Sequence, residues 1–326
     1  MQGKDARSAT KAVYIGCDVS KRWIDVHAHP IGKSWRVAND KQGIKALKRT
    51  LERMEVAIIV LEATGRWHRQ VWRSLSASGL PVAIVDPYRA RRFAQATGRL
   101  EKTDRIDARM LALFAEAMRP EAKAPPSEDM EALQELVNAW HAAKEEVTAL
   151  SNRQKAATCA FLKRDIGHAL RAMRNHVARL EAEILRRIEA DPRLAERYAI
   201  LMSIPGIGPV VAITLLVLLD ELGHVSGKHV AKLAGVAPMA WESGTWRGQR
   251  HIQGGRARVR KLLYMAAVSA GAMGANTPLK AFYDRLRARQ KPAKVAITAV
   301  MRKLIVLANT LLAEGRKWQP TPPKTA

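Results

Sequence analysis

The chain has little cysteine and no long hydrophobic run. Cys17 and Cys159 are the only cysteines among 326 residues, and they are far apart without a partner motif. Neither a disulfide framework nor a cysteine zinc site is therefore indicated. The longest apolar run, residues 210–219, is too short to cross a bilayer, and the charged start has no signal-peptide core. We expect a soluble protein of a reducing cytoplasm, with no membrane partner.

Acidic residues are also scarce. The chain has 30 Asp and Glu against 55 Lys and Arg, which gives a formal net charge of +25. Between Glu242 and Asp284 there is no acidic residue, which predicts a phosphate-binding surface. An arginine-rich composition without a ligand is the alternative interpretation. The basic residues of this interval are Arg247, Arg250, Arg256, Arg258, Arg260, Lys261 and Lys280.

Apolar and helical patterns alternate over the first 120 residues. Three strand patterns come first, and a helix capped by Asp40, a fourth strand, a second helix and a fifth strand follow. This order is that of the ribonuclease H-like fold, whose sheet is mixed because its first strands form a meander. The predicted strands are residues 13–17, 23–29, 34–38, 56–61 and 81–85.

Beyond residue 125 the composition changes to long helices. Apolar residues recur there with a seven-residue spacing, which predicts an antiparallel helical pair or an intermolecular coiled coil and favours a role in assembly. A plain helical spacer is the alternative. The spaced residues are Leu133, Leu136, Trp140, Ala143, Val147, Leu150, Ala157 and Phe161.

A third pattern begins near residue 198. Gly206 and Gly208 precede an apolar helix, so backbone amides at the helix start can approach a phosphate. This segment resembles the hairpin of helix-hairpin-helix DNA-binding modules, although a simple turn would have the same sequence. We expect four segments: an α/β domain (1–125), a coiled-coil helical region (126–197), a mainly helical domain (198–318) and a disordered tail (319–326).

Four carboxylates are candidates for a metal site. Asp18 and Glu62 end two predicted strands, while Asp104 and Asp107 lie three residues apart on one helix face. Converging carboxylates repel one another without a cation, and oxygen ligands favour Mg²⁺, with Mn²⁺ as the alternative. Each acid also has a structural interpretation as a turn residue, a helix cap or a salt-bridge partner. His27 and His29 lack nearby ligand partners, so we expect them at the surface.

Five motifs follow one another along the chain: IGCDVSK at 15–21, LEATG at 61–65, KTDRIDAR at 102–109, SIPGIG at 203–208, and ESG at 242–244 followed by Arg247 and Gly248. Together they resemble the DEDD transposases of the IS110 insertion-sequence family. The resemblance covers nearly the whole chain, and Cys17 departs from the residue that many relatives carry before the acid.

The resemblance implies a RuvC-like N-terminal domain, a coiled-coil middle and a C-terminal transposase domain. It implies Asp18, Glu62, Asp104 and Asp107 as metal ligands and Ser243 as the nucleophile. It also implies donor and target DNA, a structured bridge RNA as guide, a tetramer built as a dimer of dimers, and a prokaryotic, nucleoid-associated location. The expected nucleic-acid-binding residues are Lys102, Arg105, Gly206, Gly208, Arg247, Arg250, Arg256, Arg258, Arg260 and Lys261.

Two other functions fit parts of the sequence. A metal-dependent, structure-selective endonuclease of the Holliday-junction-resolvase kind would use the four acids and leave Ser243 as an ordinary loop residue. A non-catalytic nucleic-acid-binding assembly protein would need neither. Without the resemblance, the local sequence does not distinguish Ser243 from other loop hydroxyls, although Arg247 and Arg250 are placed to neutralise a phosphate.

Overall fold

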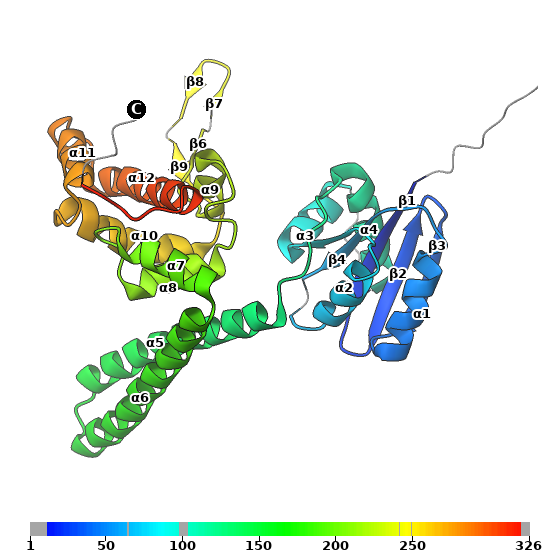
Figure 1. The fold of residues 1–326 in the computed structure, drawn as a ribbon, viewed down its shortest axis with the longest axis horizontal. Coiled ribbons are helices and arrows are strands. Elements are labelled where there is room, and N and C mark those ends of the chain that lie inside the picture. The colour runs from blue at the N-terminus through cyan, green and yellow to red at the C-terminus, as the bar shows by residue number, and fades with distance from the viewer. Residues whose placement is uncertain (1–11, 64, 98–103, 241, 249, 321–326) are drawn as a thin grey trace, which may run out of the picture. The chain divides into compact units, whose positions relative to one another are not determined.

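The computed structural model describes residues 12–320 except residues 64, 98–103, 241 and 249, and of residues 104–106, 246 and 247 it describes the backbone alone. The chain forms two compact units, Met1–Ser127 and Glu128–Ala326. The mixed α/β character of the first unit and the helical character of the second agree with the predicted fold class (Figure 1). The further division at residue 197 stays a prediction, and residues 321–326 of the expected tail lie outside the described residues.

The first unit is built on a five-stranded mixed sheet of order β3-β2-β1-β4-β5. The first three strands form the predicted antiparallel meander, and β4 and β5 run parallel to β1 and to each other. The strands lie where the apolar patterns predict them, although β1 extends two residues further and therefore includes Asp18. Their bounds are β1 Val13–Val19, β2 Trp23–His29, β3 Lys33–Ala38, β4 Val56–Glu62 and β5 Val82–Val85.

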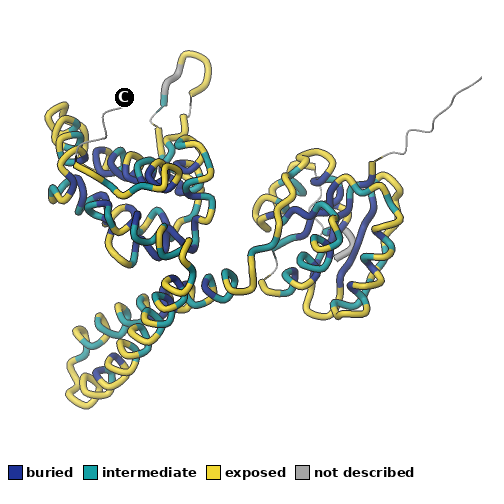
Figure 2. Tube along the Cα trace, in the orientation of Figure 1, coloured by how far each residue is buried: buried dark blue, intermediate teal, exposed yellow. Residues whose placement is uncertain are grey.

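Helices cover both faces of this sheet and enclose two hydrophobic cores (Figure 2). Helices α1 (Lys41–Leu51) and α2 (His68–Ser76) pack on the face that carries Ile15 and Cys17. Asp40 caps α1 as predicted, since its carboxylate accepts a hydrogen bond from the Gly43 amide at 2.8 Å. Helices α3 (Pro87–Ala96) and α4 (Asp104–Met118) belong to the opposite face.

Helix α4 lies unusually close to strand β1 at Gly16. A methyl group on Gly16 would stand 2.1 Å from the Ala108 carbonyl oxygen and 2.3 Å from the Ala112 nitrogen. Both alanines are buried, so small residues on the two elements let the helix backbone rest directly on the strand. This contact fixes where the beginning of α4 meets the sheet.

The second unit begins with a pair of long helices, α5 (Glu128–Ala156) and α6 (Ala160–Ala190), which pack side by side as an antiparallel pair (Figure 1). The predicted seam does not continue through Phe161, because the chain turns at residues 157–159 and Phe161 is 69% exposed in the first turn of α6. An intermolecular coiled coil stays a prediction.

The rest of the second unit is a helical body around one hydrophobic core. Trp140 of α5 is fully buried in this core, so the long pair and the body share it. Among the described residues, α12 alone has the length and apolar composition to cross a membrane, and 56% of its most apolar stretch is buried in this core. The helices are α7 Pro192–Met202, α8 Pro209–Leu218, α9 Gly227–Leu233, α10 Ala257–Ala267, the π-helical turn η1 Val268–Ala272, α11 Thr277–Ala288 and α12 Ala293–Ala313.

Replacing Gly16 with alanine tests the contact between β1 and α4. We expect Gly16→Ala to lower the free energy of unfolding by roughly 3 kcal/mol, because the methyl would meet helix backbone that cannot rotate away. Urea unfolding of the full chain measures this, with Gly208→Ala as control, since a methyl there meets nothing within 4 Å. Equal stability of the two variants would contradict the close packing.

The buried His141 should make stability depend on pH. Its Nε2 atom lies 2.8 Å from the Thr214 hydroxyl, which itself donates to the Val210 carbonyl. Burial, and then the charges of Arg258 and Lys144, lower the His141 pKa from 6.5 to about 4. His141 therefore takes up a proton near pH 6.5 in the unfolded chain but only near pH 4 in the folded chain.

We therefore expect about 2–3 kcal/mol of stability to be lost as the pH falls through this window. Urea unfolding at pH 7 and at pH 4.5 should show a smaller loss for His141→Gln than for the wild type. His229→Gln, at an exposed histidine, should follow the wild type. If His141→Gln had the same pH dependence as the wild type, another group would be responsible.

Candidate active site

Strands β1 and β4 bring Asp18 and Glu62 to the same edge of the sheet. The two strands are parallel, and Gly16 pairs with Val60 and Cys17 with Leu61. The next step in this register sets Asp18 beside Glu62, and in-register neighbours on adjacent parallel strands point to the same face. Both carboxylates are half-buried.

The face that Asp18 and Glu62 share is the one on which α4 packs. Side chains alternate along a strand, so Asp18 points to the same side as Gly16, where the Ala108 carbonyl lies. Asp107 directly precedes Ala108 and is half-buried, and Asp104 lies one turn earlier, where only the backbone is described. The Gly16 contact therefore sets this end of α4 beside the face that carries Asp18 and Glu62.

The chemistry of these acids suits a hard divalent cation, because all the donors are carboxylate oxygens. The described side chains form no group of three or more His, Cys, Asp or Glu residues placed to hold a metal, and the Asp104 side chain is not among them. The donor set thus fits the predicted ion, and the assignment of these four residues as ligands stays a prediction.

A further carboxylate, Asp25, lies opposite Asp18 in the register of β1 and β2, although its local sequence gave no sign of it. It is 5% exposed, and Arg36 of β3 donates two hydrogen bonds of 2.9 Å to its two oxygens. This bidentate pair neutralises a charge that would otherwise stand next to Asp18. The meander predicted from the sequence contains the signal, because a tight β1–β2 turn sets Asp25 across from Asp18.

The expectation that His27 and His29 lie at the surface is wrong for His27. His27 is 6% exposed, and its Nδ1 atom lies 2.7 Å from the Ser34 hydroxyl. Burial, and then the positive charge of Arg109, lower its pKa. His29 is half-buried and lies 3.1 Å from Glu116 of α4. His27 thus joins β2 to β3 within the meander, and His29 joins the meander to α4.

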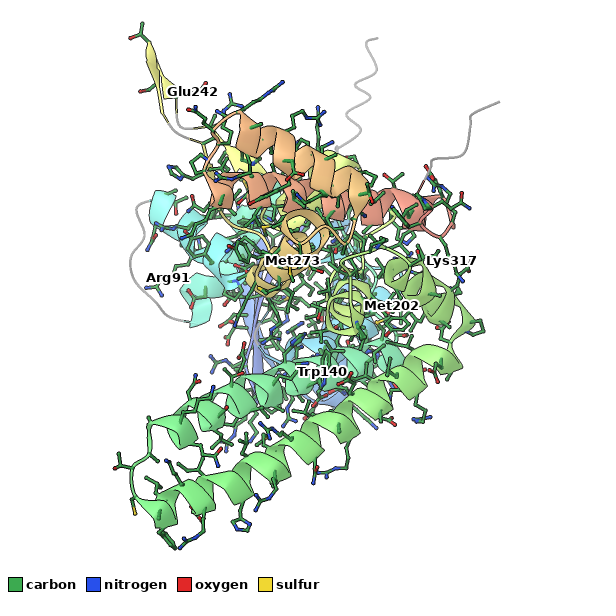
Figure 3. All side chains as sticks on the ribbon, turned by 90° about the vertical axis from the view of Figure 1, so that its left-hand side faces the viewer. Arg91, Trp140, Met202, Glu242, Met273 and Lys317 are labelled. Carbon is green, nitrogen blue, oxygen red and sulfur yellow. The ribbon has the colours of Figure 1, made fainter. Side chains whose placement is uncertain are left out.

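Ser243 lies on a β-hairpin of the second unit. It belongs to β7 (Glu242–Ser243), which pairs with β8 (Trp246–Arg247), and the two-residue loop has Gly244 at a φ of 57°. Strands β6 (Pro238–Met239) and β9 (His251–Ile252) pair at the base of the same hairpin. Ser243 is exposed, and Figure 3 shows its neighbour Glu242 on a ribbon that extends away from the helical body.

Several predicted phosphate-binding cations are engaged within the fold. Arg256 donates hydrogen bonds of 2.7 and 2.8 Å to Glu221. Burial alone would raise the pKa of Glu221, but hydrogen bonds from Arg256 and Asp220 outweigh it and lower that pKa to about 2. The other contacts are Arg250 with Glu242 at 3.3 Å, Arg258 with Asn138 at 2.6 Å, Arg260 with the Gly254 carbonyl, and Lys261 with Glu145 at 3.6 Å.

The acid-free interval is thus partly compensated by acids from other segments. Its part in nucleic-acid binding stays a prediction for Arg250, Arg256, Arg258, Arg260 and Lys261. Lys102 lies outside the described residues, and for Arg105 and Arg247 only the backbone is described.

The turn between α7 and α8 uses its two glycines differently. Gly206 has a φ of 98°, and a methyl there would lie 2.5 Å from the Ala270 Cβ, so packing on η1 requires this glycine. Gly208 precedes α8, and a methyl there would meet nothing within 4 Å. Of the two, Gly208 leaves space for a ligand beside the start of the helix.

Comparison with known proteins accounts for most of the chain. Residues 15–158 match the family model of the IS110 DEDD transposase, and residues 198–284 match that of the transposase IS116/IS110/IS902 family. The chain is 27% identical to the pilin gene-inverting protein of Moraxella bovis, over 93% of this chain and 96% of that protein. It is 29% identical to an IS110 insertion-element protein of Streptomyces coelicolor, over 48% and 38% of the two chains.

These matches confirm the family that the five sequence motifs indicated. The DEDD family implies dependence on a divalent metal, and transposition implies DNA as the substrate. The chain belongs to the IS110 family of transposases and is a DNA-recombining enzyme.

Proposed function

We propose that this transposase exchanges DNA strands at specific sites through a covalent bond between Ser243 and DNA, assisted by a divalent ion held by carboxylates of the first unit. The observation that carries the proposal is the placement of Asp18, Glu62 and the start of α4 on one face of the sheet. A chain with a net charge of +25 has little reason to gather half-buried acids unless they meet a cation and a polyanion.

The first unit supplies the metal chemistry in this proposal. Asp18, Glu62, Asp104 and Asp107 would hold Mg²⁺ or Mn²⁺, whose charge stabilises negative charge on the phosphate under attack. The strand order and the meander are consistent with a ribonuclease H-like, RuvC-like domain. The Asp25–Arg36 pair keeps one more negative charge from competing for the cation.

The second unit supplies the nucleophile. The Ser243 oxygen forms a bond to the scissile phosphorus, and the leaving DNA oxygen departs as a hydroxyl. A hydroxyl on another strand can then attack the phosphoserine and release Ser243, so the joining step needs no external energy source. The exposed hairpin supports this role, because a strand of DNA has access to the serine.

We propose that a structured guide RNA, the bridge RNA, selects the DNA site by pairing with donor and target DNA. The likeness to a pilin gene-inverting protein favours exchange at defined sites over random insertion.

The helical pair α5 and α6 exposes Phe161 and Leu162 at its tip, which suits contact with another copy, and we propose a tetramer. The α7–α8 turn, with open space at Gly208, would be the helix-hairpin-helix-like element.

A covalent adduct tests the serine. The purified protein is incubated with Mg²⁺, RNA from the flanking region of its element, and labelled donor and target DNA, and is then denatured. We expect label on the wild-type protein and none on Ser243→Ala. Thr245→Ala is the matched control, because it removes an exposed hydroxyl from the same hairpin and should keep the adduct.

Cleaved DNA without an adduct would instead support the metal-dependent endonuclease. The same reaction without RNA tests the guide, since an undiminished adduct would argue against RNA guidance. Binding without any cleavage would support the non-catalytic alternative.

Replacing one carboxylate tests the metal site. We expect Asp104→Asn and Asp107→Asn to lower the rate of strand exchange by at least roughly a hundredfold, because each removes a negative ligand from a site that neutralises phosphate charge. DNA affinity, measured alongside, should change by less than about threefold, since these acids repel DNA. A loss of affinity as large as the loss of exchange would assign both residues to binding or folding.

A further inference from the structure

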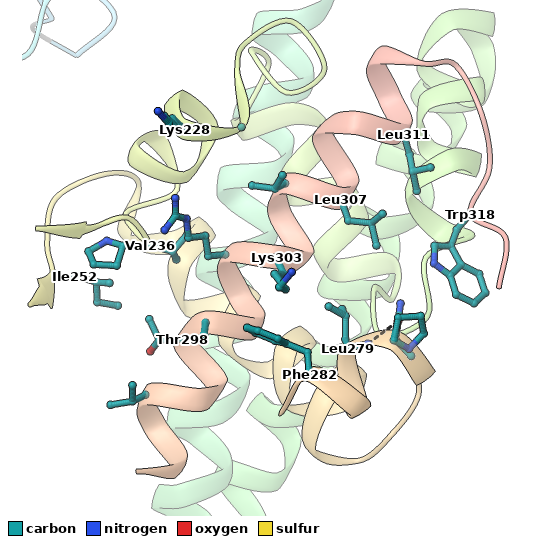
Figure 4. Close-up of a pocket in the computed structure, with 18 of the residues that line it drawn as sticks. Lys228, Val236, Ile252, Leu279, Phe282, Thr298, Lys303, Leu307, Leu311 and Trp318 are labelled. Carbon is teal, nitrogen blue, oxygen red and sulfur yellow. Dashed lines mark hydrogen bonds between the residues drawn. The ribbon is translucent and has the colours of Figure 1, made fainter. Parts of the chain in front are cut away.

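A groove of about 1060 Å³ runs along α12 in the second unit. Helix α11 lies beside it, and α9 and the base of the β6–β9 ribbon close one end (Figure 4). The groove belongs to neither the carboxylate site nor the α7–α8 turn, and of its cations the sequence pattern had indicated Arg250 alone. Its residues come from segments as distant as Lys228 and Trp318.

The lining of this groove is strongly basic. In the described part of the chain it includes no Asp or Glu, and its cations are Lys228, Arg250, Lys294, Arg302, Lys303 and Arg316. Arg250 and Arg316 are engaged by Glu242 and Glu314. The other four are exposed, and none of them makes an ion pair with a carboxylate among the described residues.

Three of these uncompensated cations are spaced along a single helix. Arg302 and Lys303 are adjacent on α12, and Lys294 lies eight residues before Arg302, which places it about two turns away along the helix. Two helical turns span about 11 Å, and such a spacing suits successive contacts along a phosphate backbone. A compact anion would meet only one end of this row.

The floor of the groove is apolar and aromatic. The Lys303 ammonium lies 4.6 Å from the centre of the Phe282 ring, and Trp318 lies further along the groove (Figure 4). Leu279 and Leu307 are also part of the lining. In a duplex the bases are paired and stacked inside, so they do not reach an aromatic floor, whereas the bases of a single strand can stack on such a surface.

One end of the groove is the root of the hairpin that carries Ser243. Pro238 of β6 and His251 and Ile252 of β9 line the groove, and Ser243 lies on the same ribbon. The 3.3 Å contact between Arg250 and Glu242 joins a lining cation to the residue before the serine. A strand in the groove therefore leads toward Ser243.

We propose that this groove binds a single-stranded segment of DNA next to the phosphate that Ser243 attacks. The cations of α12 contact successive phosphates, and Phe282 stacks against a base. The identification of the strand as DNA rests on the proposed function of Ser243, whereas the preference for a single strand rests on the groove itself.

Fluorescence anisotropy with a labelled oligothymidine, measured over a series of salt concentrations, tests the proposal on the full-length protein. The groove variant is Lys294→Ala, Arg302→Ala and Lys303→Ala combined. The control combines Arg164→Ala, Arg174→Ala and Arg179→Ala, which removes the same charge from exposed positions on α6. Circular dichroism checks that both variants fold.

We expect the groove variant to bind the oligonucleotide at least about tenfold more weakly, with a salt slope smaller by about two, because three phosphate contacts to a single strand are lost. Phe282→Leu should weaken binding roughly fivefold and leave the salt slope unchanged, since it removes stacking and no charge. The α6 control should keep the affinity and slope of the wild type.

Wild-type affinity and slope in the groove variant would overturn the proposal. An equal loss in the α6 control would also overturn it, because the loss would then reflect total charge. Oligouridine and a DNA duplex are measured in parallel, and a loss confined to either of them would overturn the assignment to single-stranded DNA.

The adduct assay on the same preparations separates this inference from the function it rests on. If the wild type forms the adduct and the groove variant still binds the strand normally, the groove inference fails and the serine mechanism stands. If the groove variant loses strand binding while the wild type forms no adduct, the groove is supported and the covalent mechanism fails.

Discussion

The direct contact of α4 with β1 at Gly16 is the constraint on which the first unit depends. Ala108 and Ala112 face a residue without a side chain, so the helix lies nearer the sheet than any larger residue would allow. The helix then places Leu111 and Phe114 in the second core of the sheet. Asp18 lies two residues after Gly16 on β1, and Asp107 directly precedes Ala108 on α4. Packing and the arrangement of the acids therefore have one common cause.

Charge compensation of the acid-free interval comes partly from acids that lie far away in the sequence. The interval without acids seemed the best phosphate surface, yet Glu221 pairs with Arg256 and Glu145 with Lys261 across long stretches of chain. These acids take up part of the charge that the sequence pattern assigned to nucleic acid. The uncompensated cations of α12 stand in an apolar sequence, Lys294 between Ala293 and Val295 and the pair Arg302 and Lys303 between Met301 and Leu304, so the pattern is that of a core helix. Only the folded surface reveals them as a row.

The elements of the sheet were predictable because each strand has a short apolar run with clear ends. The placement of Glu62 near Asp18 followed from strand order, since parallel strands bring their carboxyl ends to one edge. His27 and Asp25 were not predictable from local polarity. A polar residue on a strand is typical of a solvent-exposed face, but here Ser34 and Arg36 on the neighbouring strand satisfy both side chains in the interior. The prediction that Phe161 continues the seam was wrong, because a heptad pattern does not show where the chain turns.

The two halves of the proposed chemistry make opposite demands on the polypeptide, and the fold meets them differently. Carboxylates that share a cation must be held in place against their mutual repulsion, which the sheet and the close-packed helix provide. A nucleophile that attacks a polymer must be accessible to a long strand, which a buried position would prevent. Ser243 accordingly lies on an exposed hairpin with a glycine turn, while Asp18 and Glu62 are half-buried in the sheet. Rigid acids and an accessible serine are thus separate solutions to the requirements of one reaction.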